Sequence, residues 1–123
     1  MRDTDLDTVE NLRLLVRNFA EARDWEQFHT VRNLVLALSG ELGELTALIQ
    51  WVRDEEVDTW LEDESNRAAL EAELADVFAY LLRLADVADI DLSVALRSKT
   101  QLNETRYPQD RSKGSAAKYT QYE

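Results

Sequence analysis

Two segments of this chain carry apolar residues every three or four positions, the pattern of one face of an α-helix. The first has the row Leu34, Leu38, Glu41, Leu45, Leu48 and Val52, and the second has the row Leu70, Glu73, Val77, Tyr80, Leu84 and Val87. One proline and three glycines in 123 residues leave long helices uninterrupted. Strand patterns are too weak to build a sheet, so the sequence predicts an all-α fold.

The same periodicity predicts four helices in an antiparallel bundle. We expect them to run from Thr4 to about Arg23, from Thr30 to about Arg53, from Ser65 to about Ala88 and from Asp91 to Pro108, each beginning at a residue that can act as an N-cap. Residues 24–29 interrupt the periodicity as a connector, and the acidic residues 54–65 are predicted to form an exposed loop. This length fits one domain over residues 1–123, with a core at about 5–107 and a partly mobile tail at 109–123.

Two pairs of acidic residues stand in or beside the apolar rows. Glu41 and Glu44 are three positions apart on one segment, and Glu73 and Asp76 are three apart on the other. A carboxylate in an apolar setting is costly unless compensated, and four close together repel one another. If the rows face each other, the four carboxylates converge on a site that suits Mg²⁺, or Mn²⁺ as a substitute. The alternative is that these acids flank the core and point to solvent.

Charge and composition narrow the function classes. The net charge of −11 argues against binding a nucleic-acid polymer, which needs a basic surface, but not against a free nucleotide brought in with a metal. No apolar run approaches the ~20 residues of a membrane helix, and the first residues lack the apolar core of a signal peptide. Cytoplasmic location without membrane binding is therefore the expectation by default, and the absence of cysteine agrees with a reducing compartment.

Five stretches of sequence resemble one known family. They are RDWEQFH (23–29), RNLVLALSGELGELTALIQW (32–51), ELADVFAYLL (73–82), SKTQLNETRYP (98–108) and KYT (118–120). Together they resemble the MazG-like all-α NTP pyrophosphatases, and within them the dCTP pyrophosphatase branch, over roughly residues 12–120. The resemblance implies Mg²⁺-dependent hydrolysis of a nucleoside triphosphate, most of all dCTP or a modified dCTP, to the monophosphate and pyrophosphate. It also implies a role in cleaning the nucleotide pool and a homodimer or homotetramer.

The same resemblance assigns roles to individual residues. Glu41, Glu44, Glu73 and Asp76 become the metal ligands and the catalytic set, and which of them also acts as general base stays open. The residues expected to face the base, sugar or phosphates are Trp25, Glu26, Gln27, Phe28, His29, Trp51, Tyr80, Lys99 and Asn103. Without the resemblance, the aromatic residues among them equally fit core packing, and Lys99 and Asn103 equally fit a solvated helix face.

Three departures from the family pattern bear on the substrate. Val31 stands where close relatives often have proline, Val16 stands where some have a substrate-facing histidine, and the acidic segment 54–65 does not match. The last two weaken the inference to dCTP more than the inference to the reaction. Two alternatives therefore stay open: the same chemistry on dUTP or a broad dNTP range, and a non-catalytic acidic helical module that binds a partner protein.

Overall fold

The computed structural model describes residues 8–122. The chain divides between Asp89 and Ile90 into two compact units, which are described separately. The regular structure of these residues is entirely helical, so the predicted all-α class is confirmed. The helices are α1 (Val9–Glu21), α2 (Val31–Ile49), α3 (Val57–Glu62), α4 (Glu64–Val87), α5 (Leu92–Arg106) and α6 (Gln109–Ser112). The 3-10 turns η1 (Glu26–Phe28) and η2 (Asp54–Glu56) lie between helices, and η3 (Tyr119–Tyr122) follows α6.

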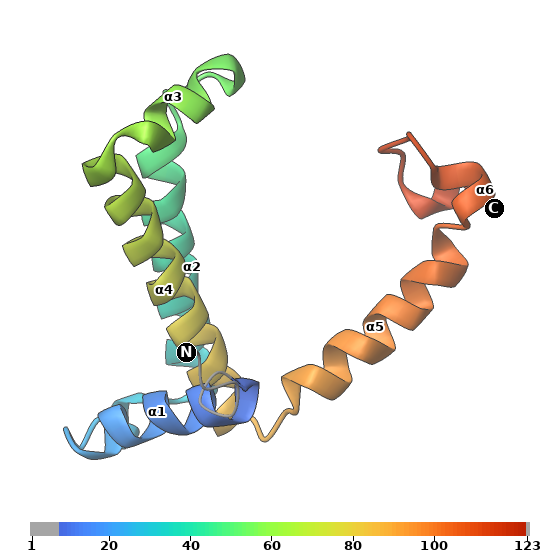
Figure 1. The fold of residues 1–123 in the computed structure, drawn as a ribbon. Coiled ribbons are helices and arrows are strands. Elements are labelled where there is room, and N and C mark those ends of the chain that lie inside the picture. Colours follow the sequence, from blue (N-terminus) through green and yellow to red (C-terminus); the bar gives the residue numbers. More distant parts are fainter. Residues whose placement is uncertain (1–7, 123) are drawn as a thin grey trace. The chain divides into compact units, whose positions relative to one another are not determined.

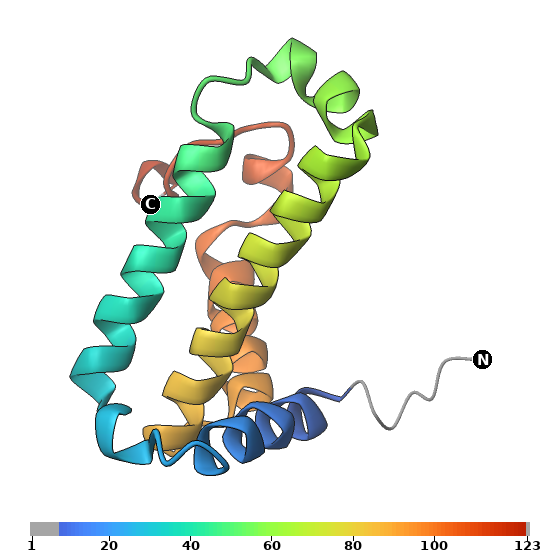
Figure 2. The same cartoon turned by 90° about the vertical axis from the view of Figure 1, so that its left-hand side faces the viewer.

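In the first unit, α2 and α4 run antiparallel and side by side, and α1 lies across one end of the pair (Figures 1 and 2). The most buried side chains are at this end: Ala20 near the end of α1, Leu34 at the start of α2, and Leu82 and Ala85 near the end of α4. The apolar core is therefore concentrated where the three helices meet.

The four long helices α1, α2, α4 and α5 each begin with a side-chain cap. The Oγ1 atom of Thr30 accepts a hydrogen bond from the backbone N–H of Asn33 at 3.1 Å, and Asp91 caps α5 in the same way, so both predicted caps are confirmed. The predicted cap Thr4 lies outside the described residues. In the structure the first helix begins at Val9 and is capped by Thr8.

The predicted cap of the third long helix was wrong. Asp63, not Ser65, caps α4, because its carboxylate accepts from the backbone N–H groups of Ser65 at 2.9 Å and Asn66 at 3.3 Å. A carboxylate at a helix N-terminus is also favoured by the helix dipole, and these contacts lower the pKa of Asp63.

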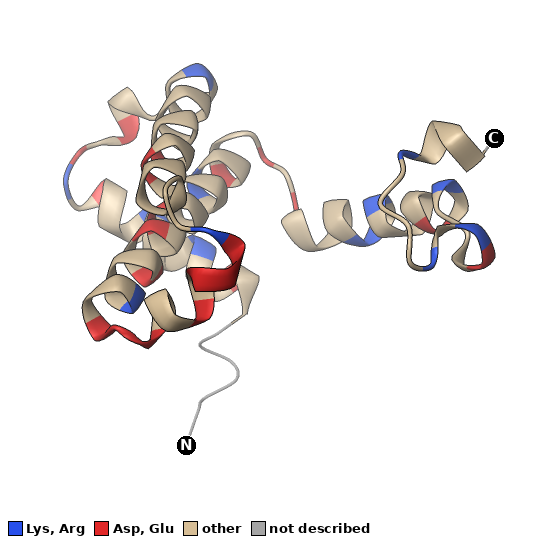
Figure 3. Cartoon of the chain, turned by 90° about the horizontal axis from the view of Figure 1, so that it is seen from above, with Lys and Arg blue, Asp and Glu red and all other residues tan. Residues whose placement is uncertain are grey.

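The predicted loop at 54–65 was also wrong, because η2 and α3 occupy it. Val57, Trp60 and Leu61 are half-buried at the spacing i, i+3, i+4, and α3 packs against α4. The acidic residues of this segment are exposed and gather at the end of the α2–α4 pair (Figure 3). Three apolar residues among seven acids are too weak a pattern to reveal a helix of six residues.

The second unit contains α5, α6 and η3. The ring of Tyr107 contacts those of Tyr119 and Tyr122 edge to face, with centroids 6.0 and 6.1 Å apart. The guanidinium of Arg106 lies 4.5 Å from the centroid of Tyr119. Residues expected only as a polar tail therefore form a short helix, a 3-10 turn and a small aromatic cluster around the end of α5.

Among residues 8–122, no single helix is both long and apolar enough to cross a membrane. The segments Val31–Ile49 and Asp54–Glu62 reach that length and composition only when taken together, and they are bent by 77° at the break between them.

Candidate functional site

An acidic cluster forms where α2 and α4 face each other. Glu41 comes from α2, and Glu73 and Asp76 come from α4; one carboxylate oxygen of each lies within 4.8 Å of the others. Glu44, the fourth predicted member, is exposed on the next part of α2 and is not in this group, although its charge acts on Glu41 and Glu73. The antiparallel helix pair thus brings three of the four predicted carboxylates together and keeps the fourth close enough to repel them.

The electrostatics of this cluster are unfavourable for the protein alone. The Oε2 atoms of Glu41 and Glu73 are buried, and no described residue offers them a hydrogen bond. Burial raises the pKa of Glu41, and repulsion by Glu44, Asp76 and Glu73 raises it further. Burial and then the charges of Glu44 and Asp76 raise the pKa of Glu73 in the same direction. The cluster therefore lacks positive charge.

A divalent cation fits these residues. The donors are all carboxylate oxygens, which hard cations prefer, and two of the oxygens are buried without a partner. Buried charges in proteins are normally paired or coordinate a metal. The acidic cluster can therefore hold a divalent metal ion.

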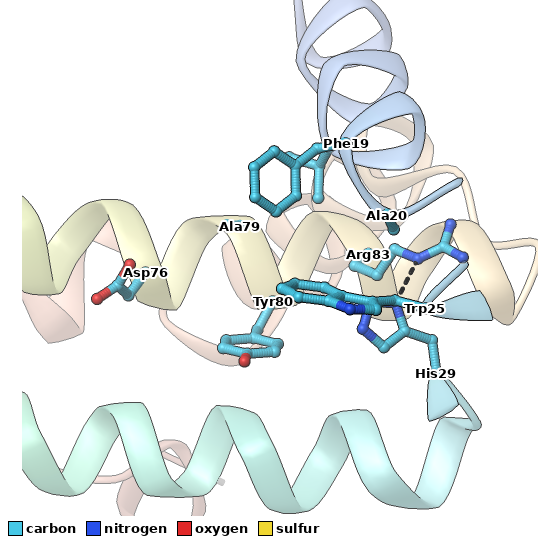
Figure 4. A pocket seen from close by; sticks show the side chains of 9 residues that line it. Phe19, Ala20, Trp25, His29, Asp76, Ala79, Tyr80 and Arg83 are labelled. Carbon is cyan, nitrogen blue, oxygen red and sulfur yellow. Dashed lines mark hydrogen bonds between the residues drawn. The ribbon is translucent and has the colours of Figure 1, made fainter. Parts of the chain in front are cut away.

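A cavity of about 180 Å³ in the first unit adjoins the cluster. Figure 4 shows its wall, which consists of Val16, Phe19, Ala20, Trp25, His29, Asp76, Ala79, Tyr80 and Arg83. Asp76 and Arg83 are seven residues apart on α4, about 10 Å along the helix axis at 1.5 Å per residue. The cavity thus extends from the acidic cluster to an aromatic end and is smaller than the ~300–1,000 Å³ typical of sites for drug-sized ligands.

The aromatic end is supported from several sides. Trp25 is 43% exposed, and its ring meets those of Phe19 and His29 edge to face, with centroids 5.7 and 6.3 Å apart. The guanidinium of Arg23 lies 3.6 Å from the centroid of Phe19. Asp24, in the turn before Trp25, has a left-handed backbone (φ 55°), which aspartate tolerates better than most residues. These contacts hold Trp25 in place while leaving part of its ring open.

The structure brings only some of the predicted substrate residues to this cavity. Trp25, His29 and Tyr80 line it. Glu26, Gln27 and Phe28 are exposed on η1 and are not part of the wall. The side-chain amide of Gln27 instead donates to the backbone carbonyl of Asp24 at 3.0 Å.

The other predicted substrate residues lie elsewhere. Trp51, two residues after the end of α2, is 86% exposed and does not line the cavity. Lys99 and Asn103 lie four positions apart on α5 in the second unit, where Lys99 is exposed and Asn103 half-buried. Roles for these three at the base and the phosphates stay predictions.

Sequence reasoning missed four wall residues, namely Phe19, Ala20, Ala79 and Arg83. Arg83 carried a usable signal, because it stands among apolar residues in LLRLADV, and Asp86 follows three positions later. A charged pair at this spacing inside an apolar run indicates a buried ion pair.

Comparison with known proteins identifies relatives of this chain. Residues 29–110 match the model of the MazG nucleotide pyrophosphohydrolase domain. The chain is 50% identical over 113 residues to dCTP pyrophosphatase 1 of Rattus norvegicus, covering 92% of this chain and 66% of that protein. It is 47% identical over 114 residues to dCTP pyrophosphatase 1 of Homo sapiens, covering 93% of this chain and 67% of that protein. The chain thus spans about two thirds of the length of these relatives.

A crystal structure supports the fold as well. The chain superposes on a pyrophosphatase from Archaeoglobus fulgidus DSM 4304 with a TM-score of 0.75 and 39% sequence identity, covering 80% of this chain and 91% of that one. The predicted family resemblance is confirmed by these matches. The chain belongs to the MazG nucleotide pyrophosphohydrolase family.

Proposed function

We propose that this chain hydrolyses a deoxynucleoside triphosphate, with dCTP or a modified dCTP preferred, to the monophosphate and pyrophosphate. In this reaction water attacks phosphorus, and the bond between the α and β phosphates breaks. The observation that carries the proposal is the cavity that joins the acidic cluster at Asp76 to the Trp25–His29 end along one face of α4. A site with metal ligands at one end and aromatic rings at the other suits a nucleotide.

The acidic cluster would hold the metal. We assign Glu41, Glu73 and Asp76 as ligands, with Glu44 as the fourth carboxylate, and Mg²⁺ as the ion with Mn²⁺ as a substitute. When bound, such an ion neutralises the triphosphate and lowers the pKa of the attacking water. The buried oxygens of Glu41 and Glu73 support this assignment, because a cation satisfies both.

The other end of the cavity would bind the nucleoside. Trp25 offers a partly exposed ring for stacking on the base, which is worth about 1–3 kcal/mol per base. His29 lies beside it as a polar group at the base edge. Tyr80, one turn after Asp76 on α4, is placed to pack against the sugar, where a close ring disfavours a 2′-hydroxyl.

We also propose that the chain acts as a homodimer or homotetramer. Several large apolar side chains on α2 and α4 are exposed, among them Leu36, Leu42, Leu74 and Phe78. Large exposed apolar patches often mark protein–protein interfaces. Light scattering coupled to size exclusion measures the mass directly, and a monomeric mass at micromolar concentration would contradict the assembly.

The activity is tested by pyrophosphate release from eight nucleoside triphosphates, the four ribonucleotides with dATP, dGTP, dCTP and dUTP, in Mg²⁺ and in EDTA. Metal-dependent release concentrated on dCTP is the expected result. Release spread over several substrates would keep the reaction and overturn the preference. No release from any of them, and no thermal stabilisation by Mg²⁺ with a nonhydrolysable nucleotide, would favour the partner-binding module.

A further inference from the structure

Arg83 is a buried arginine at the aromatic end of the cavity. It is 6% exposed, and its guanidinium makes two directed contacts: Nε donates to Nδ1 of His29 at 3.0 Å, and one terminal nitrogen donates to Oδ2 of Asp86 at 2.8 Å. Figure 4 shows the bond to His29 as a dashed line next to Trp25. One side chain thus connects a residue of the cavity wall to a buried carboxylate on the same helix.

Asp86 holds Arg83 in this arrangement. Its side chain is 3% exposed and also accepts hydrogen bonds from Arg13 and Arg17 of α1. Hydrogen bonds from Arg17 and Arg13 hold the pKa of Asp86 below its usual range, so it is ionised at neutral pH. The network therefore joins α1, α4 and the turn that carries His29.

The bond to Arg83 decides the proton position on His29. A nitrogen that accepts a hydrogen bond carries no proton, so neutral His29 must carry its proton on Nε2. Burial lowers the pKa of His29, and the positive charge of Arg83 lowers it further. Asp86 pairs with Arg83 and, on the same carboxylate, with Arg13 and Arg17 of α1. Among the described residues, Arg83 is the charged group that bonds Nδ1 of His29.

We propose that Arg83, held by Asp86, is a positioning residue that fixes His29 as a neutral Nε2–H donor facing the base. This inference rests on the proposed nucleotide site. It specifies the recognised group as a hydrogen-bond acceptor on the base edge, such as the O2 carbonyl or N3 of cytosine. A protonated His29 would have to turn its Nδ1–H away from Arg83, which would break the contact that orients the ring.

NMR gives a direct test, because His29 is the only histidine of the chain. In tag-free protein labelled with ¹⁵N-histidine, a long-range ¹H–¹⁵N spectrum contains one imidazole. At pH 7 we expect a protonated Nε2 and an unprotonated Nδ1, with a titration midpoint below that of free histidine. Arg83→Gln should move the midpoint up toward about 6.5. Arg67→Gln, an exposed arginine on the same helix, should leave it unchanged.

Kinetics supply the second readout. Losing one oriented hydrogen bond should raise the KM for dCTP about 5- to 10-fold in Arg83→Gln, with kcat within about twofold because the acidic cluster is untouched. This KM should depend on pH near the histidine midpoint, whereas the wild-type KM does not. Equal losses in KM and kcat with no new pH dependence would show a merely structural role and overturn the proposal.

Two variants of His29 test the inference without any change to Arg83, in case Arg83→Gln does not fold. The side-chain amide nitrogen of glutamine reaches the place of Nε2, and that of asparagine reaches the place of Nδ1. His29→Gln should therefore keep a KM within a few-fold of wild type, and His29→Asn should raise it more. The reverse order, or a proton on Nδ1 in the wild-type spectrum, would overturn the inference. Inactive wild type with the expected spectrum would instead count against the proposed function.

Discussion

Replacing Glu41 by glutamine should change the metal response and the metal-free stability in opposite directions. The Oε2 atom of Glu41 is buried without a partner, and burial and three neighbouring carboxylates raise its pKa. Glutamine removes one charge from this group at nearly constant shape. In EDTA at pH 7.5 the variant should therefore melt at the same temperature as wild type or higher, because a repulsion has gone.

The expected change in Tm on adding Mg²⁺ follows from the free energy of metal binding. A ligand at ten times its Kd stabilises the folded state by RT ln 11, about 1.4 kcal/mol. Unfolding entropy near 2.1 cal/mol/K per residue gives about 0.26 kcal/mol/K for the 123 residues, so wild type should gain about 5 °C in Tm. A loss of about 100-fold in affinity, the upper end for disturbing a metal site, would reduce the gain at the same Mg²⁺ concentration to below about 1 °C.

The dependence on pH has a definite sign. Because the folded-state pKa values of Glu41 and Glu73 are raised, the folded protein binds more protons than the unfolded chain between the two values. The contribution of these two carboxyl groups to the stability of the metal-free protein should therefore be greatest at or below pH 4.5. It should be lost as pH rises through their raised folded-state pKa values. The gain from Mg²⁺ should grow over the same range, since the metal binds the ionised form.

Differential scanning fluorimetry at fixed protein concentration measures all three effects. Glu71→Gln is the matched control, because it removes the same charge from an exposed position of α4 outside the cluster. This control should keep the full Mg²⁺ gain. A Glu41→Gln protein that loses several degrees in EDTA, or that keeps the wild-type gain in Mg²⁺, would refute the reasoning.

Three further predictions concern binding and stability. Trp25→Ala should raise the KM for dCTP about 5- to 150-fold, from a stacking loss of ~1–3 kcal/mol, while Trp25→Phe retains most affinity; equal KM values in both would remove Trp25 from the base site. Asp86→Asn should cost about 3 kcal/mol in urea unfolding at pH 7, and the deficit should begin to shrink only below about pH 4 and vanish as pH falls through the depressed pKa of Asp86, where wild type loses the same pairing. Leu34→Ala should cost about 2–5 kcal/mol in the same assay because Leu34 is fully buried, and a change under 1 kcal/mol would contradict its core position.

The sequence by itself determined the helices that could form and the acids that stand in their apolar rows. Periodicity placed α2 and α4, and the side chains of Thr30 and Asp91 marked two helix starts, because these signals depend only on residues within one turn of each other. The same local rule placed Glu41 on one core-facing row and Glu73 on another. Local rules failed for α3, where three apolar residues among seven acids were too few to be recognised.

Only the tertiary structure decided which of these groups meet. The antiparallel pairing of α2 and α4 brings carboxylate oxygens of Glu41, Glu73 and Asp76 together and keeps Glu44 beside them. The crossing of α1 over the end of α4 brings Arg13 and Arg17, more than sixty positions away in sequence, onto Asp86, and through Arg83 onto His29. Such contacts follow from packing between helices, which no short-range spacing encodes, and that is why the arginine network at the aromatic end was not predicted.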